Sequence, residues 1–282
     1  MMIGFVILHY QAAEETENCV HSIRCNVPEH RIVIVDNASP NGSGTYLAEK
    51  YAADPDVEVI LNSRNRGYAS GNNTGYRKLR ENCSFLVVLN SDVEITQRDF
   101  AERIEKAYRE SSFDILGPDI FSTRYNYHQN PQRVKNYTRK ELLRKEVFLA
   151  VKVYFPILLR LKYALIRNRQ ISVAQENNYH CECTGQVLHG ACYIFSERYI
   201  RTHEQCFYEG TFLYYESYIL HYLSMKEGLK LLYSPDIRVI HHEDASTNAV
   251  YGEQYRKSLF VNRCMLDSLR VFVRLIREKG EL

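Results

Sequence analysis

Hydrophobic residues in this chain gather in short runs with the length of strands, and the runs 3–8 and 85–89 have no polar side chain, as expected of strands buried on both faces. The five clearest runs are 3–8, 31–35, 57–61, 85–89 and 113–116. Between them, the spacing of apolar residues predicts helices over 14–24, 45–51 and 96–110. Strands that alternate with helices at intervals of about 25 to 30 residues predict an α/β fold with a mostly parallel, doubly wound sheet.

Local signals refine these boundaries. Thr96 and Asp99 have the spacing of a capping box, which predicts that a helix begins at Thr96. Gly117-Pro118 is expected to stop the fifth strand. Residues 62–75 are rich in glycine and asparagine and read as a long loop between the third strand and a helix.

In the carboxyl-terminal part, residues 186–195 are predicted to belong to the core again, and an aromatic segment follows at 207–220. Glu209 and Glu216 lie seven apart in that segment, which is two turns if it is helical. Gly228 is expected to close a helix. A last strand over 237–240 ends in two histidines and a glutamate, and a long helix from Tyr251 ends in a basic stretch over 270–279.

The strand 85–89 runs directly into Asn90-Ser91-Asp92, with Glu94 two residues further on. A carboxylate past the carboxyl end of a buried strand lies where open α/β sheets bind ligands. Such oxygen ligands suit Mg²⁺ or Mn²⁺, and these ions suit a diphosphate. The alternative is an ordinary polar turn into the next helix. His241 and His242 lie together at the end of the last predicted strand, and this placement favours a metal ligand there as well.

Asp36 ends the second strand, where an acidic side chain can hydrogen-bond a ribose or a base edge. The glycine fingerprint of dinucleotide-binding domains is missing, which argues against NAD. The loop 62–75 can place backbone N–H groups and amides against a nucleotide or phosphate, or it can be a simple connection.

The bulk composition is that of an ordinary soluble protein: 282 residues, 45% hydrophobic and 25% charged. A net charge of +2 gives no reason to expect a nucleic-acid partner. The eight cysteines are scattered, and the first ten residues read as a strand rather than a secretory signal, so free thiols in a reducing cytoplasm are expected.

A basic segment interrupts this pattern. Residues 133–169 hold eleven Lys or Arg against two acidic residues, and 147–166 is apolar but broken by charges and a proline. The segment is too polar to span a bilayer and favours a basic amphipathic helix, or a pair of helices, on an anionic membrane surface. The alternative is a solvated helical insertion packed on the sheet.

Taken together, the segments resemble bacterial family 2 glycosyltransferases with the GT-A fold, in the subgroup often described as rhamnosyltransferase-like. The motifs that carry the resemblance occur in order along the chain. They are VILHY (6–10), IVDNAS (34–39), NRGYASGNNTG (65–75), LNSDV (89–93), HGACY (189–193), FYEGTFLYYE (207–216) and VIHHEDAS (239–246).

The resemblance implies one GT-A domain over 1–282, with a nucleotide-sugar-binding half (1–120), a basic helical insertion (125–180) and an acceptor and catalytic half (185–282). It implies a metal, Mg²⁺ or Mn²⁺, contacted by Asp92 and by His241, with His242 as the fallback. The nucleotide-sugar contacts that it implies are His9, Asp36, Asn37, Asn65, Gly67, Asn72, Asn90 and Ser91.

The partners implied are a UDP-, dTDP- or GDP-linked sugar and a glycan acceptor, expected to be an oligosaccharide on a polyprenyl-diphosphate carrier for cell-surface polysaccharide. The enzyme is expected in the cytoplasm, peripheral on the inner face of the membrane. The sequence departs from the family at Ser217, where an aspartate usually acts as base. Glu216 is then the expected catalytic carboxylate and Glu209 the reserve. A catalytically silent binding subunit and a sugar-nucleotide nucleotidyltransferase are the rival interpretations.

Overall fold

The computed structural model describes residues 1–132, 138–155, 178–243 and 254–282, and it is a mixed α/β fold built on one ten-stranded sheet. The main strand order is β3-β2-β1-β4-β9-β6-β10-β5, with β7 beside β6 and β8 beside β10. The strands are β1 (Ile3–His9), β2 (His30–Asp36), β3 (Val57–Leu61), β4 (Phe85–Asn90), β5 (Val93–Glu94), β6 (Ile115–Ser122), β7 (Tyr127–His128), β8 (Cys183–Thr184), β9 (Cys192–Ser196) and β10 (Leu231–His241).

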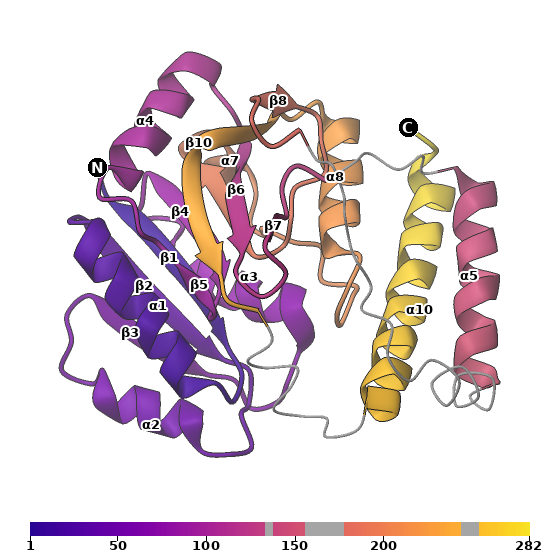
Figure 1. Cartoon of the computed structure of the whole chain (residues 1–282), viewed down its shortest axis with the longest axis horizontal. Helices are drawn as coiled ribbons and strands as arrows, with labels where there is room; N and C mark the ends of the chain where they lie inside the picture. The colour runs from indigo at the N-terminus through magenta and orange to yellow at the C-terminus, as the bar shows by residue number, and fades with distance from the viewer. Residues whose placement is uncertain (133–137, 156–177, 244–253) are drawn as a thin grey trace.

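Helices cover the sheet and extend beyond it (Figure 1). They are α1 (Ala13–Asn26), α2 (Ser43–Lys50), α3 (Gly67–Leu79), α4 (Phe100–Ser111), α5 (Arg139–Tyr154), α7 (Glu197–Thr202), α8 (Glu216–Glu227) and α10 (Gln254–Lys279). Within this described part of the chain, no helix is long and apolar enough to cross a membrane.

The predicted α/β class is confirmed, with a sheet that is parallel through β3, β2, β1 and β4 and mixed beyond. β9 runs antiparallel between β4 and β6, and β6 and β10 pair in parallel. Register aligns His9 with Asp36 and Leu8 with Asn90. The carboxyl ends of three neighbouring strands therefore meet at one edge, where ligands bind in such sheets.

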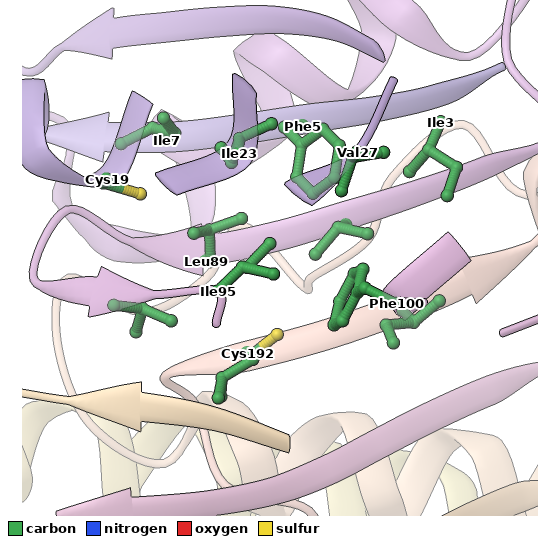
Figure 2. Packing of buried hydrophobic residues seen from close by; sticks show 14 of the residues in the cluster. Ile3, Phe5, Ile7, Cys19, Ile23, Val27, Leu89, Ile95, Phe100 and Cys192 are labelled. Atoms are coloured by element: carbon green, nitrogen blue, oxygen red, sulfur yellow. The ribbon is translucent and has the colours of Figure 1, made fainter. Parts of the chain in front are cut away.

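Apolar side chains fill both faces of the sheet, because its central strands are hydrophobic without a polar break. On one face, residues of β1 and β4 pack against α1 and α4; Figure 2 shows Phe5, Leu89 and Phe100 among them. A separate apolar cluster joins α5, α8 and α10. In Figure 1, α5 and α10 stand side by side at one end of the molecule.

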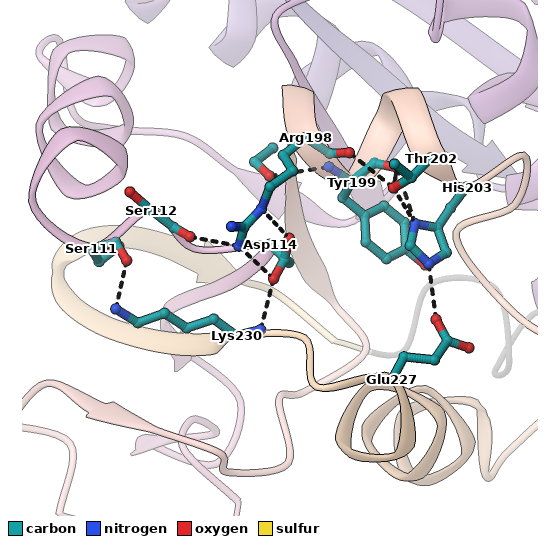
Figure 3. A network of polar contacts seen from close by, with 10 residues as sticks. Ser111, Ser112, Asp114, Arg198, Tyr199, Thr202, His203, Glu227 and Lys230 are labelled. Carbon is teal, nitrogen blue, oxygen red and sulfur yellow. Dashed lines mark hydrogen bonds and ion pairs between the residues drawn. The ribbon is translucent and has the colours of Figure 1, made fainter.

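A polar network at the opposite ends of the strands fixes the second half of the sheet (Figure 3). Arg198 of α7 makes two hydrogen bonds of 2.7 Å to the carboxylate of Asp114, just before β6. The same carboxylate accepts from the backbone N–H of Lys230, just before β10. This bidentate contact holds α7 and the starts of two strands together.

The predicted loop 62–75 is wrong in its second half, because α3 begins at Gly67. Its glycines allow the helix to lie directly on the strands: a Cβ at Gly71 would stand 2.4 Å from Leu8, and one at Gly75 2.5 Å from Val6. The asparagines are buried in the helix. The glycines of this segment, although typical of turns, therefore allow close packing of a helix against the sheet.

Two further boundaries differ from prediction. α4 begins at Phe100, without a side-chain cap, because Ile95 is held by hydrogen bonds to Ser22 and Asn26 of α1. β6 continues through Gly117-Pro118 to Ser122 because its pairing with β10 is irregular beside Pro118, where a missing N–H is tolerated.

In the aromatic segment, residues 207–215 are irregular and α8 begins only at Glu216, so Glu209 and Glu216 do not share a helix. Gly228, in the left-handed conformation, ends α8 as predicted. In the basic segment, α5 covers 139–154; residues 133–137 and 156–177 lie outside the described residues, as do 244–253.

Candidate active site

Asp36 is the last residue of β2 and is almost fully buried, close to the first turn of α2. Its carboxylate accepts hydrogen bonds from the Ser39 backbone N–H at 3.2 Å and the Ser39 hydroxyl at 2.5 Å. A Cβ at Gly44 would stand 2.2 Å from the Asp36 carboxylate, so glycine is required for α2 to approach it. The amino end of a helix favours a negative charge at this position.

His9 lies beneath Asp36, and its side chain is fully buried. Its ring nitrogens lie 2.7 Å from the Thr16 hydroxyl and 2.8 Å from the Ser43 hydroxyl. Burial lowers the pKa of His9, although the Asp36 carboxylate, 4.0 Å away, opposes that shift. Both nitrogens are therefore occupied by protein groups that join β1 to α1 and α2.

Asn37 ties the start of α3 to the end of β2. Its amide donates to Asn65 at 3.0 Å and to the Gly67 carbonyl at 3.1 Å, and its oxygen accepts from the Arg66 N–H. Gly67 has φ of +80°, and a Cβ there would meet the Phe212 backbone at 2.3 Å. Asn72 is fully buried: its amide donates to the Tyr68 carbonyl, and its oxygen has no hydrogen-bond partner among the described residues.

Asp92, just before β5, contacts His241, the last residue of β10, where these two strands pair antiparallel. The Asp92 Oδ1 lies 3.2 Å from the His241 Nε2, and both side chains are nearly buried. Alternation along β10 sends the next histidine to the other side, where His242 contacts Glu94 at 2.9 Å. Asn90 and Ser91 lead into this pair, with Ser91 buried.

The turn at His189–Gly190 lies between this pair and α8. The His189 ring centre is 6.0 Å from that of His241. Burial and His241 lower the pKa of His189 to about 3, against an opposing effect of Asp92. On its other side, the Gly190 carbonyl accepts from the Tyr68 hydroxyl at 2.5 Å, and a Cβ on Gly190 would lie 3.5 Å from the Ser217 hydroxyl.

Glu216 is the first residue of α8 and is 9% exposed. Burial raises the pKa of its carboxyl to about 7, although its own backbone N–H and the Thr211 hydroxyl, 3.0 Å away, favour the charged form. Tyr214 and Tyr215 precede it with φ of 70° and 68°, a conformation costly for side chains of this size.

Ser217 and Glu209 have different surroundings. Ser217 lies 2.8 Å from the Tyr193 hydroxyl. Partial burial acts to raise the pKa of Glu209, but hydrogen bonds from Arg77 and Asn73 outweigh it, so that the pKa is lowered. Glu209 therefore remains ionised and paired, which makes it a weak proton acceptor.

A surface pocket of about 340 Å³ adjoins the start of α3. Its lining comes from the loop before α3, the first turn of that helix and the 209–212 segment, namely Arg64, Asn65, Arg66, Ser70, Glu209 and Phe212.

The donor atoms fit a divalent cation in part. One carboxylate oxygen and one imidazole nitrogen converge at Asp92 and His241. No cluster of three or more His, Cys, Asp or Glu side chains with metal-site geometry occurs among the described residues. Mg²⁺ and Mn²⁺ commonly take one or two protein ligands and complete their shell with water and substrate phosphates, so the pair suits such an ion.

Known proteins resemble this chain in sequence and in fold. The sequence profile of the family described as Glycosyl transferase family 2 matches residues 5–164, more than half of the chain. The chain belongs to glycosyl transferase family 2. A curated relative, the undecaprenyl-phosphate mannosyltransferase of Micrococcus luteus, is 29% identical over 93 residues, covering 33% of this chain and 38% of that protein. The chain thus matches well under half of this relative's length.

Two solved structures show that the fold is of the GT-A type. S. aureus TarS (residues 1–349) superposes with a TM-score of 0.52 at 11% identity, over 86% of this chain and 60% of that one. GalNAc-T7 with UDP, GalNAc and Mn²⁺ superposes with a TM-score of 0.58 at 14% identity, over 100% of this chain and 55% of that one.

In this member of family 2, most of the residues singled out from the sequence fall into two connected groups at one edge of the sheet. The first joins His9, Asp36, Asn37, Asn65 and Gly67. The second joins Asp92 to His241, and the His189–Gly190 turn links it to the start of α8.

Sequence reasoning missed the residues that make those links. Tyr68, Tyr193 and Gln129 contact Gly190, Ser217 and His241 respectively. The tyrosines stand inside the family motifs, so their position was a usable signal. Gln129 stands in a stretch without periodicity or motif, and nothing in the sequence marks it.

Proposed function

We propose that this chain is an inverting, metal-dependent glycosyltransferase of the rhamnosyltransferase-like subgroup, moving a hexosyl or rhamnosyl unit from a nucleoside-diphosphate sugar to a glycan acceptor. The observation that supports it most is the connected edge itself. Three features belong to the two groups described above and the start of α8. They are the buried carboxylate of Asp36, the pair of Asp92 and His241, and the carboxyl of Glu216 with a pKa of about 7.

The donor is held, in this proposal, by the first connected group. Asp36 accepts a hydrogen bond from the ribose or the base, and His9 positions Asp36 from beneath rather than touching the ligand, because its ring nitrogens are already occupied. Asn37 and Asn65 set the path of the loop, and Gly67, Asn90 and Ser91 are proposed to contact the sugar and diphosphate. Asn72, which is fully buried, acts within α3. UDP-, dTDP- and GDP-sugars all fit this chemistry.

Asp92 and His241 would hold Mg²⁺ or Mn²⁺, which stabilises the negative charge that develops on the departing nucleoside diphosphate. GalNAc-T7, whose fold is similar, was solved with UDP and Mn²⁺, which supports this choice of ions.

Glu216 acts as the base. Its carboxylate takes the proton of the acceptor hydroxyl while that oxygen forms a bond to the anomeric carbon. The bond from the anomeric carbon to the diphosphate oxygen breaks, and the diphosphate leaves with the electron pair. A base with a pKa near the working pH is efficient in this role, typically contributing about 10² to 10⁴ in rate.

The acceptor is proposed to be a polyprenyl-linked oligosaccharide of cell-surface polysaccharide synthesis, such as capsule, O-antigen or exopolysaccharide, reached from the inner face of the cytoplasmic membrane. The relative from Micrococcus luteus is named for undecaprenyl phosphate, a polyprenyl lipid, which supports this class. Five apolar side chains exposed at the end of α5 support an approach to the bilayer: Val147, Phe148, Val151, Tyr154 and Phe155. Basic residues of the same helix favour anionic lipid.

The test is release of nucleoside diphosphate from a panel of UDP-, dTDP- and GDP-sugars with and without Mn²⁺. One donor is expected to give slow, metal-dependent release, reduced at least about 100-fold in Asp92→Ala. Glu94→Ala is the matched control, because Glu94 lies two residues away but pairs with the exposed His242; it should stay near wild type. Absence of both turnover and nucleotide binding across the panel would contradict the proposal.

Ser217 favours one rival, a catalytically silent binding subunit, because serine cannot serve as base at neutral pH. Tight nucleotide binding with no turnover in the presence of membrane-extracted lipid-linked acceptor would support that rival over the enzyme.

A further inference from the structure

Gln129 bridges His241 to a second carboxylate. It follows β7 directly, is 4% exposed, and its backbone N–H donates to the Ile120 carbonyl of β6 at 2.8 Å. Its side-chain oxygen lies 2.8 Å from the His241 Nδ1. Its side-chain nitrogen donates to the Glu243 carboxylate in a short hydrogen bond.

This arrangement fixes the orientation of the Gln129 amide. An ionised carboxylate can only accept hydrogen bonds, so the NH₂ group faces Glu243 and the carbonyl oxygen faces His241. That oxygen can only accept, which places a proton on the His241 Nδ1. In the neutral ring, the Nε2 lone pair then points at the Asp92 carboxylate, 3.2 Å away.

Two acceptors at 3.2 Å repel each other unless a positive charge lies between them. A divalent cation between them supplies that charge. Histidines that bind metals commonly donate their other N–H to an oxygen, and this contact sets both the tautomer and the ring orientation. The Glu243–Gln129–His241 chain provides that contact.

We propose that Gln129, oriented by Glu243, is a positioning residue that holds His241 in the Nδ1–H tautomer, so that Nε2 and Asp92 together bind the divalent cation. The proposal rests on the metal dependence proposed above and deepens it. The next residue fixes the backbone of the neighbouring histidine: the buried Asn130 accepts from the His189 backbone N–H at 2.7 Å. The segment after β7 therefore contacts the ring of His241 and the backbone of His189.

The experiment titrates Mn²⁺ alone into the whole protein and follows the free ion by electron paramagnetic resonance. Gln129→Leu keeps the size of the side chain and removes both hydrogen bonds, and it is expected to weaken Mn²⁺ binding about 10- to 100-fold. The double variant Gln129→Glu with Glu243→Gln exchanges acid and amide, restores both hydrogen bonds and keeps the net charge. It is expected to bind Mn²⁺ within a few-fold of wild type.

Gln97→Leu is the matched control. The Gln97 side chain also hydrogen-bonds β10, but at the Arg238 N–H and the Asp236 carbonyl rather than at His241, so Mn²⁺ affinity should not change. A second readout needs no metal: ¹⁵N spectra of the histidines, with His241→Ala for assignment, should show an Nδ1–H tautomer in wild type and its loss in Gln129→Leu.

The outcomes separate this proposal from the function on which it rests. Equal Mn²⁺ affinity in wild type and Gln129→Leu, or an Nε2–H tautomer of His241 in wild type, overturns the role of Gln129 and leaves metal-dependent transfer standing. No Mn²⁺ binding by wild type overturns the metal site itself and this proposal with it.

Discussion

At the scale of single residues, the surroundings of Glu216 separate it from the other acidic side chains of its segment. Glu209 is paired with Arg77 and keeps a lowered pKa, whereas Glu216 is buried with one neutral hydroxyl partner and has a pKa of about 7. Tyr214 and Tyr215 have left-handed backbone conformations just before α8, which begins at Glu216. Backbone strain of this kind is often found at functional sites.

Glu216→Gln is expected to abolish transfer while stabilising the fold at alkaline pH. The folded pKa lies above the unfolded value of about 4.5, so the native state binds more protons and loses stability as pH rises from 4.5 through 7. The amide removes that loss. Urea unfolding should therefore show the variant about 1 to 3 kcal/mol more stable at pH 8, and nearly equal to wild type at pH 4.5.

The rate of turnover by the wild type should rise with pH through a pKa near 7, as the Glu216 carboxyl ionises.

Ser217→Asp is the informative comparison. If Glu216 is the base, adding the family's usual carboxylate changes the rate little. A gain of about 10² or more would mean that the base function is missing from the natural chain.

At the scale of elements, α3 carries the loop that frames the proposed donor site, and its position depends on glycine. Gly71 and Gly75 let the helix axis approach β1 and β2 more closely than any side chain would permit. Asn73, on the same helix, hydrogen-bonds the backbone at 206–207, so the helix also supports the segment that leads to Glu216.

Gly75→Ala is expected to destabilise the protein by about 1 to 3 kcal/mol, although alanine is the better helix former by about 1 kcal/mol. The added Cβ would meet Val6 at 2.5 Å and Val35 at 3.1 Å, and both belong to central strands that cannot move cheaply. Thr74→Ala, one residue away and only half-buried, should change the free energy of unfolding little. Equal stability of Gly75→Ala and wild type in urea would show that α3 can shift away from the sheet.

At the scale of the whole molecule, α5 and α10 form a separate apolar layer beside the sheet (Figure 1). Leu142 and Leu149 of α5 face inward, and Arg270 of α10 contacts Glu146. Other side chains here are exposed: Phe148 of α5 is 60% exposed, and Phe155, just past the end of the helix, is 62% exposed. Apolar side chains flanked by lysine and arginine on one helix suit the boundary between headgroups and acyl chains of an anionic bilayer.

Phe148→Ser with Phe155→Ser is expected to lower binding to phosphatidylglycerol-containing vesicles by at least about 10-fold in co-sedimentation, because each ring contributes about 1 to 2 kcal/mol on entering the interface. Release of diphosphate from the soluble donor should not change. Tyr46→Ser with Tyr125→Ser removes two exposed rings elsewhere and serves as control. Equal vesicle binding by both double variants would contradict a membrane contact through α5.

The sequence alone determined the order and type of most elements, because buried strands and amphipathic helices have local periodicities. It also marked the strand ends Asp36, Asp92 and His241, since a polar residue after an apolar run needs only short-range pattern to be seen. It failed where distant contacts override local preference. Thr96 does not start a helix, because the residue before it, Ile95, is hydrogen-bonded to α1. The glycines of 67–75 are helical, because the sheet lies against them.

Only the tertiary structure decided which functional groups meet. Alternation along β10 turned His241 toward Asp92 and His242 toward Glu94, and burial at the start of α8 raised the pKa of Glu216 while a salt bridge lowered that of Glu209. Gln129 contacts His241, although the two residues are 112 positions apart in the sequence. Distances, burial and the partners of each ring nitrogen follow from packing between segments far apart in the chain, and no local pattern contains that information.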